Sequence, residues 1–377
     1  MCPAMHDVHA FLSNWMRSLD MAVAVDAIGN LHGVYPGRKQ NSERRLLIGS
    51  HLDTVPNAGA FDGVVGVVLG IALVQALDAE RLPFAIEIIG FSEEEGVRFN
   101  TPFLGSRGLI GRVDDNLLGR TDEMGITISD AIREFGLDPS VSRKALLPSG
   151  AFAYLEFHIE QGPILEHLGQ PLGVVKTIAG QSRYSITFIG AANHAGTTPM
   201  SLRRDALAGA AEWITMVEAE ANSIANLVAT VGSIKSEPRA GNVIPGFVAA
   251  TLDLRHAEDE IRRNMASELL DEADQIAGRR KLGFCAESCL DQSAVGMDSA
   301  LVYALQRAAL KAGCDAPLMT SGAGHDAMIM AEKIPSVMMF IRSPGGISHH
   351  ADESVLVGDV ELAVSAGMHF LKELATE

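Results

Sequence analysis

The chain of 377 residues is 47% apolar, and its 47 acidic residues outnumber its 30 basic residues to give a net charge of −17. This length and apolar content can fill two hydrophobic cores, whereas the negative charge argues against binding to nucleic acid or to an anionic membrane surface. The four scattered cysteines, Cys2, Cys285, Cys289 and Cys314, exclude a disulfide-built scaffold and indicate a reducing compartment. No long apolar run and no signal-peptide pattern occurs, so we expect a cytoplasmic protein.

The first part of the chain predicts a helix, two short strands and a buried strand that ends in a polar motif. Residues 8–19 have a helical pattern, and residues 22–37 are typical of two strands joined by a turn. The apolar run before Gly49 then places His51 and Asp53 at the end of a strand. In extended chain these side chains point to the same side, so Asp53 could accept the other ring proton of a metal-bound His51. Alone, the pair is equally compatible with a buried histidine that has a satisfied hydrogen bond.

Polar residues recur after the apolar segments that follow. Asp62 precedes a glycine-rich apolar stretch, residues 63–77, which predicts a buried helix. Residues 84–91 predict a strand followed by Glu93, Glu94 and Glu95, whose charges repel one another unless cations or protons intervene. A solvated acidic surface is the alternative interpretation. Later apolar segments are followed by His158, Glu160 and Gln161, by His325 and Asp326, and by His349 and His350. Because the strand ends of an α/β sheet form its binding sites, this distribution favours a functional site.

The order of the predicted elements changes once along the chain. Up to about Val175, strands and helices alternate, which predicts an α/β catalytic domain with a mixed, largely parallel sheet flanked by helices. Residues 181–292 instead have the order β-α-β-β-α-β of a ferredoxin-like α+β fold. We therefore predict a catalytic domain of residues 1–180 and 293–377 and an inserted domain of residues 181–292. Residues 123–147 have a helical pattern without a function that the sequence indicates.

Eight motifs in this order support a family assignment. They are GSHLDTVP, FDGVVG, SEEEGVRF, HIEQGP, HAGTTPM, NVIPG, SGAGHDA and GGISHH, and together they cover nearly the whole chain. They resemble the motifs of the two-metal amidohydrolases of the aminoacylase and carboxypeptidase superfamily. The resemblance is closest to the ureido-cleaving branch, which includes allantoate amidohydrolase and N-carbamoyl-L-amino acid hydrolase.

This resemblance implies a centre of two divalent metal ions, Zn²⁺ or Mn²⁺, in the catalytic domain. Asp62 matches the carboxylate that bridges both ions. His51 and His158 would complete the protein ligands of one ion, and Glu95 and His349 those of the other. Mixed histidine and carboxylate ligands do not discriminate between the two metals.

The residues beside these predicted ligands have separate expected roles. Glu94 matches the general base, which takes the proton of the attacking water and passes it to the leaving nitrogen. Glu93 is expected to face solvent or to support its loop. His350 is an alternative to His349 as the ligand.

The resemblance also implies substrate-binding residues in both domains. Gln161 and His325 would hold the substrate near the metals, and His194 would stabilise the developing oxyanion in its own subunit or in that of a partner. Arg255 offers the bidentate fork that binds a carboxylate, and Asn242 offers an amide suited to the same carboxylate or to a ureido group. The alternatives without a function are a surface ion pair for Arg255 and a turn amide for Asn242.

The expected activity is hydrolysis of the ureido C–N bond of a small carboxylate-bearing substrate, with allantoate as the first choice. N-carbamoyl-L-amino acids are the main alternative, followed by a peptidase or acylase activity of the same superfamily. An inactive binding module is disfavoured because every expected ligand and the base are present. Relatives dimerise through the inserted domain, so we expect a homodimer. Arg342 could meet a second polar arm of the substrate or face solvent.

Overall fold

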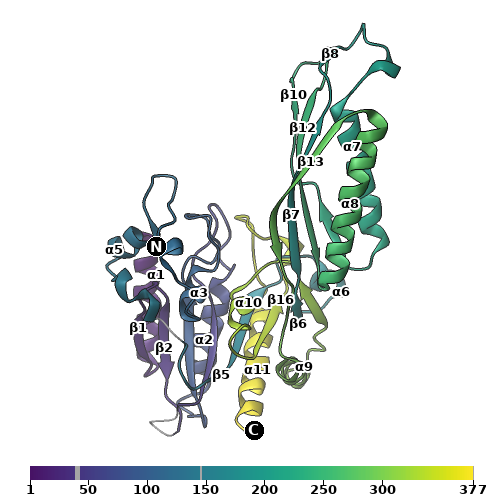
Figure 1. Cartoon of the computed structure of the whole chain (residues 1–377). Helices are drawn as coiled ribbons and strands as arrows, with labels where there is room; N and C mark the ends of the chain where they lie inside the picture. The colour runs from purple at the N-terminus through teal and green to yellow at the C-terminus, as the bar shows by residue number, and fades with distance from the viewer. Residues whose placement is uncertain (39–42, 145–146, 377) are drawn as a thin grey trace. The chain divides into compact units, whose positions relative to one another are not determined.

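The computed structural model describes residues 1–38, 43–144 and 147–376 of the chain (Figure 1). It divides into two compact units, one formed by Met1–Lys176 with Gly296–Glu377 and the other by Thr177–Val295. The second unit is therefore an insertion between two segments of the first. The boundaries that we predicted from the sequence lie within a few residues of these positions.

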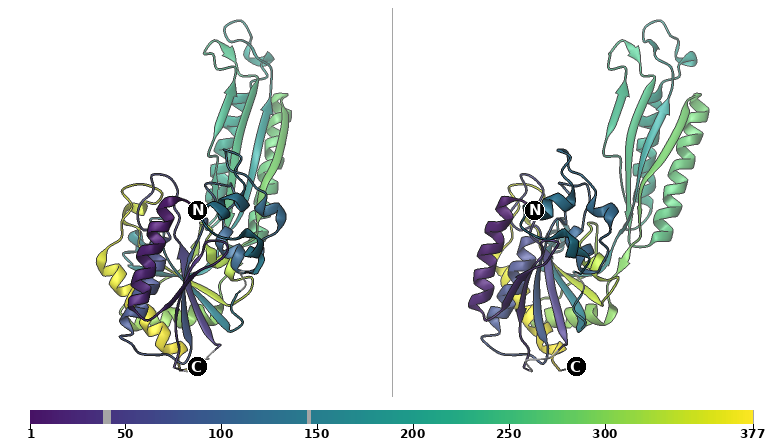
Figure 2. Two further views of the ribbon diagram at one scale, coloured as in Figure 1. Left: turned by 90° about the vertical axis from the view of Figure 1, so that its left-hand side faces the viewer. Right: turned by 60° about the vertical axis from the view of Figure 1, so that its left-hand side comes forward.

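The first unit is built on a mixed sheet, whose strands fan out side by side in Figure 2. Its strands are β1 (Ala22–Val25), β2 (Leu31–Tyr35), β3 (Arg45–His51), β4 (Ala85–Phe91), β5 (Ala151–Ile159), β6 (Leu172–Ile178), β14 (Val295–Gly296), β15 (Leu318–Ser321) and β16 (Ser336–Ile341). Within the described residues they follow the order β1-β2-β4-β3-β5-β16-β6-β14, and β15 also pairs with β6. The central strands β4, β3, β5 and β16 are parallel, whereas β2 and β6 join them antiparallel. The predicted fold class is confirmed.

Helices cover both faces of this sheet. They are α1 (Pro3–Ser18), α2 (Val64–Ala76), α3 (Leu104–Leu109), α4 (Asp115–Leu118), α5 (Ile128–Glu134), α6 (Ile164–Leu168), α9 (Ser299–Lys311), α10 (Asp326–Met330) and α11 (Val357–Leu374), with 3-10 turns η1 (Pro139–Lys144) and η3 (Pro344–Gly346). Gly367 of α11 lies against the ring of Phe157 in β5, and α11 also packs on α2. Glu156, which precedes Phe157 in β5, accepts a hydrogen bond from the backbone N–H of Ala327 in α10. Because successive strand residues point to opposite faces, α10 lies on the face opposite to α2 and α11.

Local sequence explains why α2 and the central strands form where they do. Apart from Gln75 near its end, the α2 segment consists of apolar residues and glycine, and most of these are buried, as expected of a helix packed between the sheet and other helices. Strands β4 and β16 are buried along their whole length and, apart from Glu87 and Ser336, consist of apolar residues and glycine, as is typical of parallel strands covered on both faces. The segment predicted as helical at residues 123–147 forms α5 and η1, and its residues 145–146 lie outside the described residues.

The second unit is an antiparallel sheet with two helices on one face. Its elements are β7 (Gly180–Ile189), β8 (Asn193–His194), η2 (Met200–Leu202), α7 (Ala206–Ser223), β9 (Val228–Thr230), β10 (Ile234–Glu237), β11 (Val243–Ile244), β12 (Phe247–His256), α8 (Asp259–Arg280) and β13 (Gly283–Gln292). The sheet order is β10-β12-β7-β13, β9 pairs with β12, and β8 pairs with β11 separately. The residues of β12 alternate between more and less buried positions, so α7 and α8 cover one face around the buried Trp213. This is the predicted β-α-β-β-α-β order, with one predicted strand divided into β9 and β10.

None of the helices in the described part of the chain combines the length and the apolar character needed to cross a membrane.

Candidate metal centre

The predicted ligands meet at one edge of the first unit's sheet. His51 is the last residue of β3, His158 is the second-last residue of β5, and Glu94 and Glu95 follow β4. These three strands are parallel neighbours, so their carboxyl ends reach the same edge. Asp62 reaches this edge from the loop before α2.

Asp62 lies at the centre of the cluster. Its Oδ1 lies 3.3 Å from Nε2 of His158 and 3.8 Å from Nε2 of His51. Its Oδ2 lies 3.0 Å from Nε2 of His349, which in turn lies 3.6 Å from Oε1 of Glu95. The two oxygens of one buried carboxylate therefore face two separate sets of potential ligands.

These sets have the composition of a two-metal centre. Ligand atoms of His51, Asp62 and His158 lie within 4.8 Å of one another, and so do those of Asp62, Glu95 and His349. Asp62 belongs to both groups, as a bridging carboxylate would. Oε1 of Glu95 is buried without a hydrogen-bond partner among the described residues, although the ring of His349 is near. A cation would satisfy this oxygen, so the residues fit a pair of divalent ions.

The backbone around the cluster has unusual conformations that follow from its close packing. Gly63 has φ of +67°, and a Cβ there would clash with the His51 ring, so only glycine suits this position. Three other residues at the site, Glu93, Gln161 and His349, have positive φ values of 54°, 57° and 55°. Such conformations are costly for residues with a side chain and gather where function demands them.

Glu94 has the environment expected of a buried carboxylate that exchanges a proton. It is 6% exposed, and its Oε2 lies 4.0 Å from Nε2 of His51. Burial, followed by the nearby charges of Asp326 and Asp53, raises the pKa of Glu94 well above its ordinary value. Cations bound at the cluster would lower this pKa, because they stabilise the ionised form.

The role expected for Asp53 is corrected in its detail. The Nδ1 atom of His51 lies 2.8 Å from the backbone carbonyl oxygen of Asp53, whereas the Asp53 carboxylate is 4.0 Å away. That carboxylate instead accepts hydrogen bonds from the backbone N–H groups of Glu94, at 2.9 Å, and Glu95, at 3.1 Å. Asp53 therefore fixes the His51 ring through its main chain and the glutamate turn through its side chain.

The two substrate-binding residues predicted in the first unit both lie at the cluster, one beside Asp62 and the other beside His158. Nε2 of Gln161 lies 3.0 Å from each oxygen of Asp62. His325 is 1% exposed, and its ring packs edge-on against that of His158, with centroids 4.4 Å apart. Its Nε2 pairs with the Ser321 hydroxyl at 2.9 Å. In this conformation His325 supports His158 and does not face solvent.

The structure shows different environments for His349 and His350, and it places Glu93 away from solvent. His349 faces Asp62 and Glu95, whereas His350 is 64% exposed and lies 3.6 Å from the Asp352 carboxylate. Glu93 does not face solvent, because it is 6% exposed and its carboxylate pairs with the amino group of Met1. The loop-supporting alternative describes it better.

The three predicted residues of the second unit fall at two different places. His194 and Asn242 lie together, because β8 and β11 pair with His194 opposite Val243, and Asn242 accepts a hydrogen bond from the N–H of Ala195. Arg255 lies near the far end of β12, eight residues from Phe247, which corresponds to about 26 Å of extended strand. Figure 1 shows β8 beyond the end of the sheet that carries β10 and the start of β12. Asn242 and Arg255 of one chain therefore lie far apart, whether Asn242 binds the carboxylate or the ureido group, and their predicted roles stay predictions.

Two arginines considered for substrate binding are engaged in ion pairs. Arg255 donates to both oxygens of Asp253, at 2.8 and 3.1 Å, and Asp253 also accepts a hydrogen bond from Arg183 at 2.8 Å. Arg342 donates to both oxygens of Asp359 in α11, at 2.8 and 2.9 Å. Arg342 thus anchors α11, which the sequence did not indicate.

Sequence reasoning missed the buried carboxylate of Glu156 behind the cluster, and it assigned no role to Asp326, which it named beside His325. Glu156, which is fully buried, accepts hydrogen bonds from the Ser50 hydroxyl at 3.2 Å and from Tyr154 at 3.1 Å, and burial raises its pKa to about 8. Asp326 is also fully buried, and burial together with the Glu156 charge raises its pKa well above the ordinary value. Glu156 precedes His158 by two residues in β5 and so shares its face. That spacing was the available signal.

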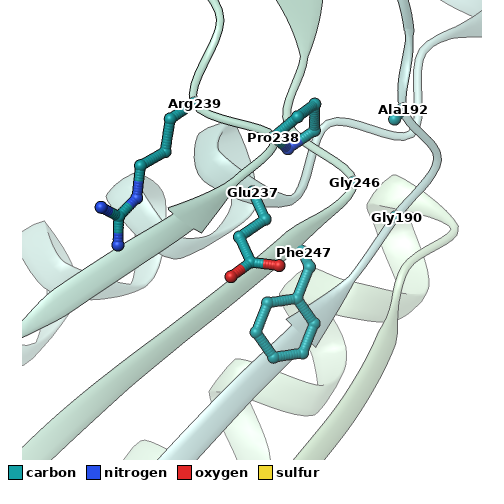
Figure 3. A pocket seen from close by; sticks show the side chains of 7 residues that line it. All are labelled: Gly190, Ala192, Glu237, Pro238, Arg239, Gly246 and Phe247. Atoms are coloured by element: carbon teal, nitrogen blue, oxygen red, sulfur yellow. The ribbon is translucent and has the colours of Figure 1, made fainter.

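A separate hollow of about 630 Å³ lies in the second unit (Figure 3). It is lined by Gly190, Ala192, Glu237, Pro238, Arg239, Gly246 and Phe247. None of the predicted ligands or substrate residues lines it. The metal cluster, not this hollow, therefore remains the candidate site.

Comparisons with known proteins place the chain in a family. The model of Peptidase family M20/M25/M40 matches residues 47–373, and the chain belongs to this family. It is 40% identical to an allantoate deiminase of Arabidopsis thaliana, over 99% of this chain and 77% of that protein. It is 39% identical to an N-carbamoyl-L-amino-acid amidohydrolase of Pseudomonas sp. (strain NS671), over 93% of this chain and 86% of that protein.

A solved structure agrees with this assignment. An amidase of the hydantoinase/carbamoylase family from Burkholderia multivorans superposes with a TM-score of 0.91 and 34% identity, covering 98% of this chain and 90% of that chain. The predicted class, an amidohydrolase of this superfamily, is confirmed.

Proposed function

We propose that this enzyme hydrolyses the ureido C–N bond of a small carboxylate-bearing substrate, with allantoate as the preferred substrate and N-carbamoyl-L-amino acids as the second candidate. The observation that carries the proposal is the buried Asp62 carboxylate, whose two oxygens face two groups of potential metal ligands. The names of the two relatives, an allantoate deiminase and an N-carbamoyl-L-amino-acid amidohydrolase, support the two substrates in that order.

The centre would hold two divalent cations, Zn²⁺ or Mn²⁺, with Asp62 bridging them. His51 and His158 would complete one set of protein ligands, and Glu95 and His349 the other. When bound, such ions supply a polarised carbonyl and a water of lowered pKa.

The remaining residues of the cluster would move and hold the reacting groups. Glu94 would take the proton of the attacking water and deliver it to the leaving nitrogen, a role that its burial beside His51 supports. The Gln161 amide, now directed at Asp62, would turn to the ureido group of the substrate. Its amide can both donate and accept a hydrogen bond, as that group requires.

Recognition of the carboxylate and the oxyanion would involve two copies of the chain. His194 and Asn242 lie beyond the opposite end of β12 from Arg255, and strands paired in one sheet do not bring such positions together. One substrate could contact all three residues if His194 and Asn242 came from a partner subunit and Arg255 from the same chain as the metal ligands. The homodimer and this division of roles are both part of the proposal, and β13, an edge strand of the inserted sheet, is a surface through which two copies could pair.

Mixing two inactive variants tests the division of roles. His194→Ala and Arg255→Ala are purified separately, mixed under conditions that allow subunit exchange, and assayed. If sites are shared, each mixed dimer has one intact site, so about a quarter of wild-type activity should return for a two-fold symmetric dimer. No recovery, with exchange verified by differently tagged subunits, would mean that an intact site takes His194 and Arg255 from the same chain.

Ammonia release tests the reaction itself. Allantoate, an N-carbamoyl-L-amino acid and ureidoglycolate are compared side by side with enzyme loaded with Mn²⁺ or Zn²⁺, and Asp62→Ala is the matched inactive control. The highest kcat/KM is expected for allantoate. Release from none of the three substrates, by enzyme that contains metal, would refute the proposed function.

A further inference from the structure

Glu353 lies outside the eight sequence motifs, and no role was predicted for it. It follows His349 by four residues, and its side chain is buried, with the residue 5% exposed. Its Oε1 accepts hydrogen bonds from the backbone N–H groups of Phe61 and Asp62, both at 3.0 Å. Its Oε2 lies 3.3 Å from the donating Ser348 hydroxyl. One carboxylate therefore connects the loop that carries Asp62 with the loop that carries His349.

These two loops are almost 300 residues apart in the chain, yet their side chains must meet within one ligand group. Oδ2 of Asp62 and Nε2 of His349 are 3.0 Å apart. Glu353 binds the main chain of Phe61 and Asp62 and the side-chain hydroxyl of Ser348, the residue just before His349, so it links the two segments on which that distance depends. Gly59 lies so close to Glu353 that a Cβ there would clash with its side chain, which shows that the Asp62 loop is folded tightly around this carboxylate.

Gln161 also contacts both side chains, because its Nε2 lies 3.0 Å from each oxygen of Asp62 and 3.5 Å from Nε2 of His349, but it does not bind the two backbones. His349 itself has a left-handed backbone with φ of 55° and is 48% exposed at its side chain, so packing alone constrains it weakly. Hydrogen bonds from backbone amides to a buried carboxylate are stronger than those between neutral groups. The polar contacts of Glu353 are therefore suited to keep both loops in place.

We propose that Glu353 is a positioning residue that holds Asp62 and His349 in the geometry needed to bind two metal ions together. This inference rests on the proposed two-metal function. Glu353 acts through its acceptor oxygens, and it is neither a ligand nor a proton carrier. Residues that orient metal ligands in this way commonly change metal affinity by ten- to a hundredfold when they are removed.

The test compares Glu353→Ala and Glu353→Gln with wild type by calorimetric titration of Mn²⁺ into metal-free protein. Glu353→Ala should bind at least one ion about ten- to a hundredfold more weakly. Glu353→Gln keeps an acceptor oxygen for the two amides but loses the charge and the second acceptor, so it should lose clearly less metal affinity than Glu353→Ala. Asp352→Ala is the matched control, because it removes a neighbouring carboxylate that is 78% exposed and lies beside His350. This control should bind metal as wild type does.

Several outcomes separate positioning from a general loss of structure. Circular dichroism and urea unfolding of the metal-free proteins establish whether each variant is folded, and kcat at saturating Mn²⁺ should fall in Glu353→Ala with little change in KM. If the alanine variant does not fold, Glu353→Asp replaces it, since its shorter side chain cannot reach both amides and Ser348 together. Wild-type affinity in a folded alanine or aspartate variant would overturn the inference, and so would equal losses in the alanine and glutamine variants. Wild type that binds no metal would instead refute the proposed function.

Discussion

The charge state of His32 predicts how the free energy of unfolding depends on pH. His32 belongs to a network that reaches the loop of Glu93, Glu94 and Glu95 after β4. The Nε2 of His32 lies 3.2 Å from Asp26, and its Nδ1 lies 2.8 Å from Glu87. Asp26 also accepts a hydrogen bond from the side-chain amide of Asn30, whose carbonyl oxygen accepts the backbone N–H of Ser92 at 3.0 Å. Ser92 directly precedes the three glutamates, so this network supports the loop that carries Glu94 and Glu95.

The magnitude follows from the pKa of His32. Burial alone would lower this pKa, but the hydrogen bonds to Asp26 and Glu87 outweigh it and raise the pKa from 6.5 to about 9. The folded state therefore retains a proton that the unfolded state loses between these two values. A shift of this size corresponds to about 3 kcal/mol of unfolding free energy. This contribution is complete below about pH 6.5 and is lost as the pH rises through about 9.

Urea unfolding of wild type and His32→Gln measures the contribution of the His32 charge to the free energy of unfolding. Glutamine can form hydrogen bonds but has no positive charge, so the variant should be less stable near pH 6. Near pH 10 the free-energy difference between the two proteins should be smaller by about 3 kcal/mol. His167→Gln is the control, because His167 is exposed. A destabilisation by His32→Gln that is the same at both pH values would refute the reasoning, since the effect would then come from packing and not from charge.

Three further predictions concern the candidate centre. Asp62→Ala should reduce two bound metal ions per chain toward zero, and elemental analysis that finds one ion, unchanged by the mutation, would contradict the bridging role. Glu94→Gln should keep both metals and lose about two to four orders of magnitude in kcat, whereas Glu95→Gln should lose metal first; equal metal loss in both variants would mean that the two roles are misassigned. Arg255→Lys should lower kcat/KM for a carboxylate substrate at least tenfold, about 1.4 kcal/mol, with metal content unchanged. An analogue with an amide in place of the carboxylate should show little further loss, and equal damage with both substrates would assign Arg255 to the fold.

The sequence predicted the cluster because one topological rule places strand ends together. His51, Glu94 and His158 follow or end apolar runs, and parallel neighbours in an α/β sheet bring such positions to one edge. Motif resemblance then distinguished His349 from His350, a choice that strand pattern alone could not make. Both residues lie in a loop, where no periodicity indicates which side chain turns inward.

The sequence could not predict which atoms of a residue make a contact, or which distant residues the sheet brings together. The pattern placed Asp53 beside His51, but it is the main-chain carbonyl of Asp53 that meets the ring. His32 has no motif context, and its charge depends on Glu87, which is 55 residues away and reaches it only through the pairing of β2 with β4. Arg255 and Asp253 share a face of β12 at a spacing of two residues, so their ion pair could have been predicted.

The predicted metal ligands and the predicted substrate-binding residues of the insert lie in different units, so metal binding and substrate recognition should be separable by mutation. Every predicted metal ligand and the base lie in the first unit, whereas His194, Asn242 and Arg255 lie in the second. Within that second unit, the rigid pairing of β7 with β12 keeps Arg255 away from the β8–β11 pair. If these residues have the roles that we propose, metal binding depends on contacts inside one unit, whereas recognition needs residues that the strand pairing holds apart within one insert. A mutation that impairs pairing of the inserts should consequently leave the metal centre intact while it removes recognition, which is the separation expected if the substrate is held by two chains.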